Sequence, residues 1–215
     1  MNDPLNSHLM DIISDPASTG LILAGGYGIQ LKQAHLKEMG ERTVIASIPE
    51  SRATQDIDFF LSLSFFLSSE KGKAVRQLLD RLEYTVVLNS ENHRFEKRHK
   101  LEKQMNNDVI VDFLARQPLL SEAVKSDSFR VGKNSGANLH GRTTVEAFAV
   151  EDSPVKLTVK TIGVNDGLAI AEVLVPHPYA WINLKVRAAH DWLLRERGEK
   201  PPKANSRKHV LMYIF

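Results

Sequence analysis

The chain has 215 residues, of which 42% are hydrophobic and 25% are charged, and its formal net charge is only +2. These values are typical of a globular protein of one or two domains, and they exclude a disordered or uniformly basic chain. The absence of cysteine excludes disulfides and thiolate metal sites, and no run reaches the ~20 apolar residues of a membrane span. Because the first residues are too polar for a signal peptide, we expect a cytoplasmic protein with no membrane partner.

Two glycines follow a short apolar segment near the start of the chain. Residues 20–24 (GLILA) are predicted to form a buried strand, and Gly25-Gly26 separates it from a predicted helix over 27–39. Glycine lets a phosphate approach the backbone, and the start of a helix offers free N–H groups and a positive dipole end. A tight turn without a ligand explains two glycines as well, and on this motif alone it is the better interpretation.

Asp56 and Asp58 lie two positions apart inside an apolar run that continues to Leu61. On a strand they share one face, while Ile57 and Phe59 line the other. Two such carboxylates repel each other unless a cation lies between them, and hard oxygen ligands of this kind suit Mg²⁺. The pattern therefore predicts half of a magnesium site, with a polar turn carrying two solvated aspartates as the alternative.

A second apolar strand is predicted over residues 108–114, and it contains Asp112. A charge within such a strand is almost never fully buried unless it is paired or binds a metal. If this strand lies beside the strand of Asp56 and Asp58, Asp112 completes a cluster of three carboxylates.

The remaining segments alternate between helical, β and polar patterns. We expect helices from Leu5 up to Asp15-Pro16, over 71–82 and over 179–197, strands over 84–88, 156–162 and 169–175, and a loop over 126–138. The basic stretch 93–100 is expected to be a solvated strand face or a hairpin, with a contact to phosphates as the alternative. Residues 140–143 are explained equally well by a loop turn or a substrate contact, and Lys185 is expected to be solvated on the pattern alone.

Three motifs, in this order, resemble the nucleotidyltransferase superfamily with the polymerase-β-type fold: Gly25-Gly26 at a strand-to-helix turn, Arg52-x-Thr54-x-Asp56-x-Asp58, and Asp112 in an apolar strand. Within it, the chain is similar over about residues 20–114 to the toxin branch of AbiEii/AbiGii type. The resemblance implies an α+β fold, in which a mixed-sheet nucleotidyltransferase core over 1–125 is flanked by helices. A β-hairpin and a helical C-terminal part over 126–215 are expected to pack on this core.

The resemblance also implies an activity and assigns residues to it. The activity is the Mg²⁺-dependent transfer of a nucleoside monophosphate from a nucleoside triphosphate to an acceptor hydroxyl of an RNA end, a protein or a small molecule. Catalytic and metal-binding roles then belong to Asp56, Asp58 and Asp112. Nucleotide-binding roles belong to Gly25, Gly26, Arg52, Thr54 and Lys185. In the toxin branch an RNA or protein target and an antitoxin protein are the expected partners.

Three features depart from the pattern of that branch. The gap between Gly26 and Asp56 is longer than usual, and Tyr27 stands where a small hydroxyl residue is common. Residues 207–215 resemble the start of the last helix of the branch but lack its aspartate, so we expect this helical extension to be truncated. Two alternatives stay open: a degenerate, non-catalytic nucleotide-binding or antitoxin-like protein, and another Mg²⁺-dependent phosphoryl enzyme such as a nuclease.

Overall fold

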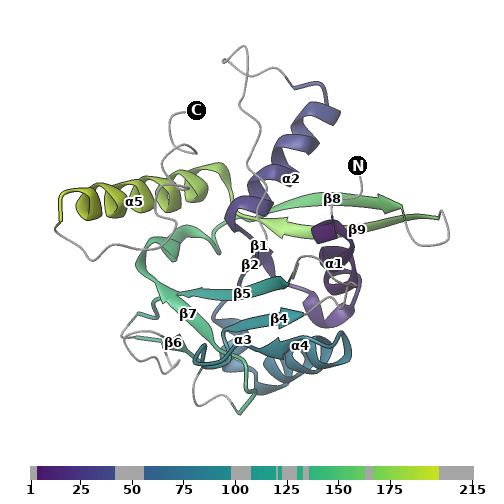
Figure 1. The fold of residues 1–215 in the computed structure, drawn as a ribbon, viewed down its shortest axis with the longest axis horizontal. Coiled ribbons are helices and arrows are strands. Elements are labelled where there is room, and N and C mark those ends of the chain that lie inside the picture. The colour runs from purple at the N-terminus through teal and green to yellow at the C-terminus, as the bar shows by residue number, and fades with distance from the viewer. Residues whose placement is uncertain are drawn as a thin grey trace, which may run out of the picture.

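A computed structural model describes residues 4–41, 56–97, 108–119, 121–122, 130–132, 136–162 and 167–198. In this part of the chain, helices pack against a mixed sheet whose strand order is β3-β4-β5-β2-β1-β9-β8 (Figure 1). Strand β7 lies beside β5, and β6 pairs with β7. The fold class is therefore mixed α and β, as the sequence predicts.

The helices are α1 (Pro4–Ile13), the 3₁₀ helix η1 (Pro16–Ser18), α2 (Gly25–Glu38), α3 (Ser64–Leu67), α4 (Ser69–Arg81), the 3₁₀ helix η2 (Val145–Ala149) and α5 (Pro178–Glu196). The strands are β1 (Ile22–Leu23), β2 (Asp56–Phe60), β3 (Thr85–Val86), β4 (Arg94–Lys97), β5 (Val109–Arg116), β6 (Arg130–Val131), β7 (Gly141–Thr144), β8 (Val155–Ile162) and β9 (Leu168–Val175). None of the described helices combines the length and the apolarity that crossing a membrane requires.

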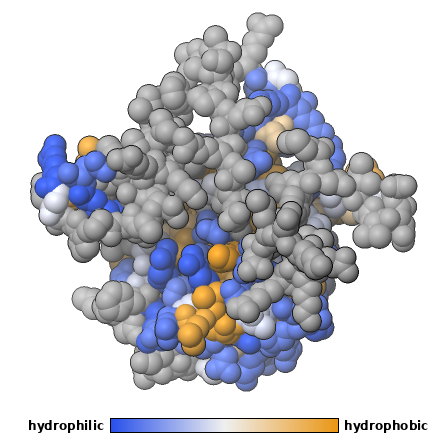
Figure 2. Space-filling model, in the orientation of Figure 1, coloured by the Kyte–Doolittle hydropathy of each residue, from blue (hydrophilic) through white to orange (hydrophobic). Residues whose placement is uncertain are grey.

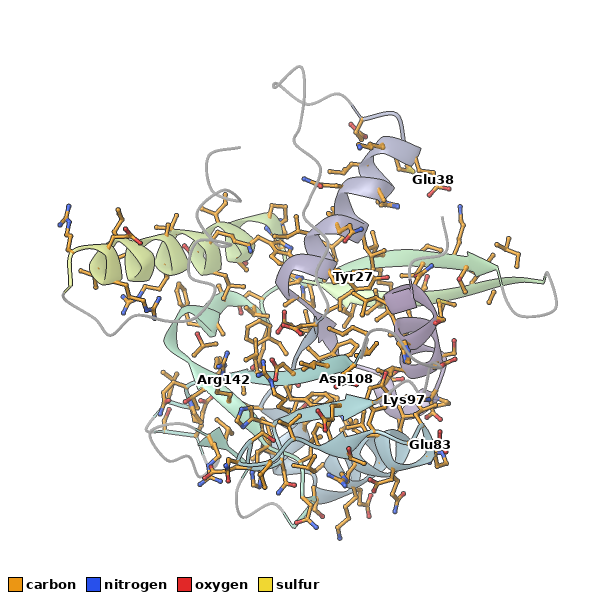
Figure 3. The ribbon with its side chains drawn as sticks, viewed as in Figure 1. Tyr27, Glu38, Glu83, Lys97, Asp108 and Arg142 are labelled. Carbon is orange, nitrogen blue, oxygen red and sulfur yellow. The ribbon has the colours of Figure 1, made fainter. Side chains whose placement is uncertain are left out.

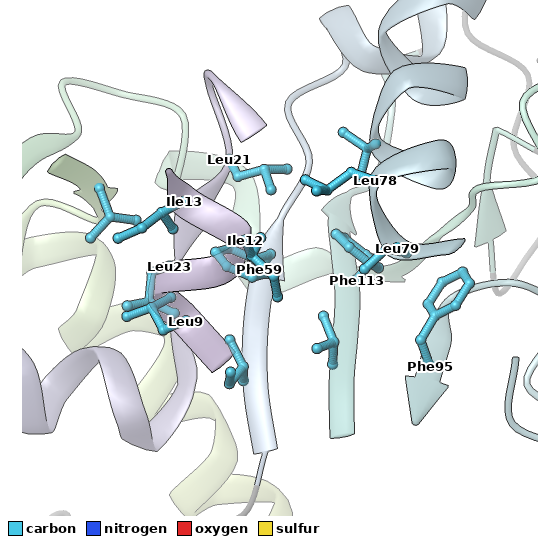
Figure 4. Packing of buried hydrophobic residues seen from close by; sticks show 14 of the residues in the cluster. Leu9, Ile12, Ile13, Leu21, Leu23, Phe59, Leu78, Leu79, Phe95 and Phe113 are labelled. Carbon is cyan, nitrogen blue, oxygen red and sulfur yellow. The ribbon is translucent and has the colours of Figure 1, made fainter. Parts of the chain in front are cut away.

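The larger hydrophobic core lies on the face of the sheet that α1 and α4 cover. Figure 4 shows Leu9 and Ile12 of α1 and Leu78 and Leu79 of α4 directed at Phe59 of β2 and Phe113 of β5. The rings of Phe59 and Phe113 are stacked with centroids 6.1 Å apart, and Phe95 of β4 meets Phe113 edge-on at 5.7 Å. Apolar residues recur every three to four positions in α1 and α4, so one side of each helix packs on the sheet. Hydrophilic residues lie over the outer side of α2 and over α4 (Figure 2).

A smaller cluster covers part of the opposite face. It consists of Ile22, Ala24, Phe60, Ala147, Ala149, Val150 and Ala180, with Leu114, Leu174, Trp181 and Leu184 packed against it. Because Ile22 and Phe60 alternate with Leu23 and Phe59 of the larger core, η2 and α5 lie on the other side of the sheet from α1 and α4.

The C-terminal strands continue the sheet of the N-terminal part. Strand β9 pairs in parallel with β1 through Ile22 and Leu174, and β7 pairs in parallel with β5. The sheet thus runs across the boundary expected between residues 125 and 126. The predicted hairpin of β8 and β9 and the predicted helix α5 are both present.

Three expectations about local structure are wrong. The strand expected over 20–24 is only β1, and α2 begins at Gly25 rather than at residue 27, because Gly25 adopts a φ of +65° that turns the chain directly into the helix. Strand β6 interrupts the loop expected over 126–138. Residues 141–144 form a strand because β5 pairs with them from a distance in sequence, which local periodicity does not reveal.

Candidate functional site

The acidic side chains of β2 and β5 lie on one face of the sheet. The two strands are parallel, and their register places Asp58 directly opposite Asp112, with Asp56 opposite Ile110. Residues in register on neighbouring strands point to the same face, and Asp56 shares that face with Asp58 because side chains alternate. The structure therefore brings the three predicted carboxylates together on the face opposite the larger core.

The electrostatic environment of Asp58 is unusual for a carboxylate. Burial raises the pKa of Asp58 to about 7, and the negative charges of Asp112 and Asp56 add to this effect. The positive charges of Arg142 and Lys185 act in the opposite direction and lower the pKa. The pKa of Asp58 thus depends on both its acidic and its basic neighbours.

Helix α2 starts against the side chain of Asp58. The backbone N–H of Ala24 donates to the backbone carbonyl of Asp58 at 2.8 Å, which ties the start of the helix to β2. A Cβ atom on Gly25 would lie 1.8 Å from Oδ2 of Asp58, so only glycine fits here, with Gly26 following as the second residue of the helix. The N-cap residue of α2 is Ala24, which offers no capping side chain, and the Asp58 carboxylate lies against the first turn at Gly25. The first N–H groups of α2 therefore face the site.

Asp112 is held by an arginine that the sequence did not single out. Nε of Arg94 donates to Oδ1 of Asp112 at 2.7 Å, and Nη2 donates to Oδ2 at 2.5 Å. The Asp112 side chain is only 8% exposed, and hydrogen bonding to it raises the pKa of Arg94. Arg94 belongs to the basic stretch 93–100, and its place opposite Asp112 in the antiparallel register of β4 and β5 explains the contact. The expected strand is present over residues 94–97, but it is not a solvated face, because Arg94 pairs with Asp112 and Phe95 is buried.

Lys185 reaches the site from α5. Trp181 packs so closely on α2 that a Cβ on Gly28 would lie 3.0 Å from its ring, and Lys185 follows one helical turn later. Burial lowers the pKa of Lys185, while the charge of Asp58 raises it. Lys185 is half-buried rather than solvated, because the docking of α5 against α2 carries it to the sheet.

Arg142 is a second basic residue that sequence reasoning left undecided. It lies opposite Leu114 in the parallel register of β7 and β5, and therefore on the acidic face of the sheet, the face that carries Asp56, Asp58 and Asp112. Figure 3 labels it beside these strands. Its charge lowers the pKa values of Asp58 and His93. The only sequence signal was its place in the segment 140–143, for which a substrate contact was one of two interpretations.

The carboxylates differ in how well they suit a metal ion. Among the described residues, no three His, Asp or Glu side chains form a group that could hold a metal. Of the three carboxylates Asp56, Asp58 and Asp112, Asp112 accepts a hydrogen bond from Arg94 on each of its two oxygens. Asp56 and Asp58 still fit Mg²⁺, which usually takes one or two carboxylates and completes its shell with substrate phosphates. The repulsion between Asp56 and Asp58 is what such an ion would relieve.

Two predicted nucleotide-binding residues, Arg52 and Thr54, lie outside the described residues, as does the helical extension expected over 207–215. The described part of the site comes from six elements that are distant in sequence: β2, β5, β4, β7, the start of α2, and α5. No family model, curated protein or solved structure matches this chain. The functional conclusion therefore depends on the geometry and chemistry of these residues.

Proposed function

We propose that this chain is a Mg²⁺-dependent nucleotidyltransferase with a core of the polymerase-β type. The observation that carries the proposal is the contact between the Asp58 carboxylate and Gly25 at the start of α2, where the N-cap residue Ala24 offers no capping side chain. A metal-binding carboxylate and an anion-binding helix start, side by side, are what the transfer of a phosphoryl group from a triphosphate requires. A nuclease would need the carboxylates but would not need a binding site for a triphosphate.

Each part of the site has a role in this proposal. The first N–H groups of α2, at Gly25 and Gly26, would bind phosphate oxygens, and Lys185 would add positive charge from α5. Asp56 and Asp58 would hold Mg²⁺, which supplies charge stabilisation to the triphosphate when bound. Arg52 and Thr54 are assigned to the nucleotide by the resemblance alone.

The proposed chemical step forms one bond and breaks one bond at the α-phosphorus of the nucleoside triphosphate. An acceptor hydroxyl oxygen forms a bond to the α-phosphorus of the nucleoside triphosphate, and the bond from that phosphorus to the bridging oxygen of the β-phosphate breaks. The nucleoside monophosphate is then joined to the acceptor, pyrophosphate leaves, and the hydroxyl proton passes to one of the carboxylates Asp56, Asp58 and Asp112 or to solvent. Basic side chains aimed at the phosphates stabilise charge that develops in the transition state.

For the acceptor and the protein partner, we propose only classes of molecule. An RNA end, a protein hydroxyl or a small molecule would each serve as acceptor, and a protein antitoxin is the partner that the resemblance implies. Because nucleoside triphosphates are cytoplasmic metabolites, we propose that the chain acts in the cytoplasm. These assignments rest on analogy with the branch rather than on contacts in the site.

Label transfer tests the proposal directly. The protein is incubated with Mg²⁺, each nucleoside triphosphate labelled at the α-phosphate, and total RNA or protein from cells. We expect label in an acceptor with the unmodified chain and a loss of at least about 100-fold in Asp58→Asn, because removing one charged group from such a site costs this much. Asp80→Asn, on the exposed side of α4, is the matched control and should retain full activity.

The binding step is tested separately by thermal unfolding. A ligand that binds only the native state raises the melting temperature, so Mg²⁺ and a triphosphate together should give a shift that neither gives alone. A shift without label transfer to any acceptor would indicate a nucleotide-binding protein rather than an enzyme. Full activity in Asp58→Asn would contradict the proposal.

A further inference from the structure

The contact between Arg94 and Asp112 bears on how many metal ions the site holds. In a row of three carboxylates, two divalent ions about 4 Å apart would share the acidic groups. Here the guanidinium of Arg94 already covers both oxygens of Asp112, through Nε to Oδ1 at 2.7 Å and Nη2 to Oδ2 at 2.5 Å. We propose that Arg94 is a built-in cation in the place of a second metal ion, so that the site takes a single divalent ion on Asp56 and Asp58.

The register of the sheet places Arg94 firmly. Strands β4, β5 and β2 are neighbours, and Arg94, Asp112 and Asp58 follow one another across them in the paired positions. The next residue of β4, Phe95, is fully buried in the larger core and lies opposite Val111. Because the backbone on both sides of the pair is part of the sheet, the guanidinium is presented by a rigid element rather than by a loop.

The chemistry of the pair favours an arginine over a displaceable ion. Arginine keeps its charge at every physiological pH, and its planar group matches the two oxygens of a carboxylate. The side chain of Asp112 is 8% exposed and that of Arg94 is 38% exposed. A second divalent ion would have to separate a nearly buried ion pair and leave the arginine beside another cation, which is unfavourable on both counts.

This inference rests on the proposed function, and it specifies the positioning role of one residue. Asp112 orients Arg94 instead of binding metal, and Arg94 supplies positive charge on the side of Asp58 away from α2.

Counting bound Mn²⁺ in the absence of nucleotide tests this inference. Free Mn²⁺ gives a sharp electron paramagnetic resonance signal that is lost on binding, so a titration reports the number of ions per chain. We expect one ion for the unmodified chain, two for Arg94→Gln, which frees the Asp112 carboxylate, and one again for the double variant Arg94→Gln with Asp112→Asn. Arg81→Gln removes the arginine of a surface pair with Asp15 and is the matched control, with one ion expected.

Each result decides the inference. Two ions on the unmodified chain, or one ion on a folded Arg94→Gln, would overturn it while leaving the proposed transferase activity intact. No bound ion together with no label transfer would overturn the proposed function as well. If Arg94→Gln does not fold, the unmodified chain and Arg94→Lys, which keeps the charge, still decide the question, because both should bind one ion.

Discussion

The two faces of strands β2 and β5 differ in chemistry along most of their length, although Phe60 and Leu114 are apolar on the face of the aspartates. One face carries Ile57, Phe59, Val111 and Phe113, all of which are fully buried. The other carries Asp56, Asp58 and Asp112 in alternate positions of the same two strands. The same two strands thus carry residues that stabilise the fold and residues of the proposed site, separated by the alternation of side chains.

The two faces contribute to stability with opposite sign. Burying a Phe or Ile side chain stabilises the fold by roughly 1.5–3 kcal/mol. The acidic face costs free energy, since burial and like charges raise the pKa of Asp58 to about 7. A face that is unfavourable for the fold but retained in the structure is typical of a functional site.

The largest effect is expected on the apolar face, at Phe113. Phe113→Ala removes a ring that packs on Phe59 and Phe95, and we expect the free energy of unfolding to fall by about 3–5 kcal/mol. Urea denaturation measures the change. Leu168→Ala, at a side chain that is 64% exposed, is the control and should stay within about 0.5 kcal/mol. A loss below about 1 kcal/mol for Phe113→Ala would mean that the stacked rings do not hold this face together.

A second test concerns the contact between the acidic face and α2. Gly25 and Gly40 both have positive φ, +65° and +70°, but a Cβ on Gly25 would meet Asp58 whereas a Cβ on Gly40 would meet nothing within 4 Å. Gly40→Ala should therefore cost only the backbone term of about 1–2 kcal/mol. We expect Gly25→Ala to cost about 1–3 kcal/mol more, because of the overlap, and to remove binding of Mg²⁺ with triphosphate.

A double variant separates the two contributions at Gly25. Gly25→Ala combined with Asp58→Ala removes the carboxylate that the new methyl group would strike. Its stability, compared with that of Asp58→Ala alone, should fall only by the backbone cost seen at Gly40. If the extra cost of Gly25→Ala persists without the Asp58 side chain, the close contact is not its cause.

The smallest of these effects is expected from neutralising Asp58. Its folded-state pKa, about 7, is above the value of ~3.9 in an unfolded chain, so the folded state binds the proton more tightly. The free energy of unfolding of the unmodified chain should therefore fall as pH rises from about 4 to 7. Asp58→Asn lacks this fall, and since one pKa unit corresponds to ~1.4 kcal/mol, we expect it to be more stable by at least ~1 kcal/mol at pH 8.

Denaturation with a chelator present, at pH 5 and pH 8, measures this difference. The stabilisation by Asp58→Asn should be clearly larger at pH 8 than at pH 5. An Asp58→Asn variant that is less stable than the unmodified chain at pH 8 would show that the Asp58 charge is compensated by its basic neighbours, Arg142 and Lys185.

Local patterns in the sequence determined much of the fold and part of the site. The spacing of Leu9 and Ile12, the stripe of α4 and the long pattern after Pro178 predicted helices that the structure contains. Alternation within β2 alone put Asp56 and Asp58 on one face. These features depend on interactions within a few residues, which is why periodicity and turn residues were sufficient.

Only the tertiary structure decided what surrounds those carboxylates. The parallel register of β2 and β5 sets Asp112 beside Asp58, and the antiparallel register of β4 sets Arg94 on Asp112. The strand at 141–144 and the docking of α5 bring Arg142 and Lys185 to the same place. Pairing between distant strands depends on the whole sheet and on side chains that are far apart in sequence, so a segment such as Gly141–Thr144 carries no local signal of its partner.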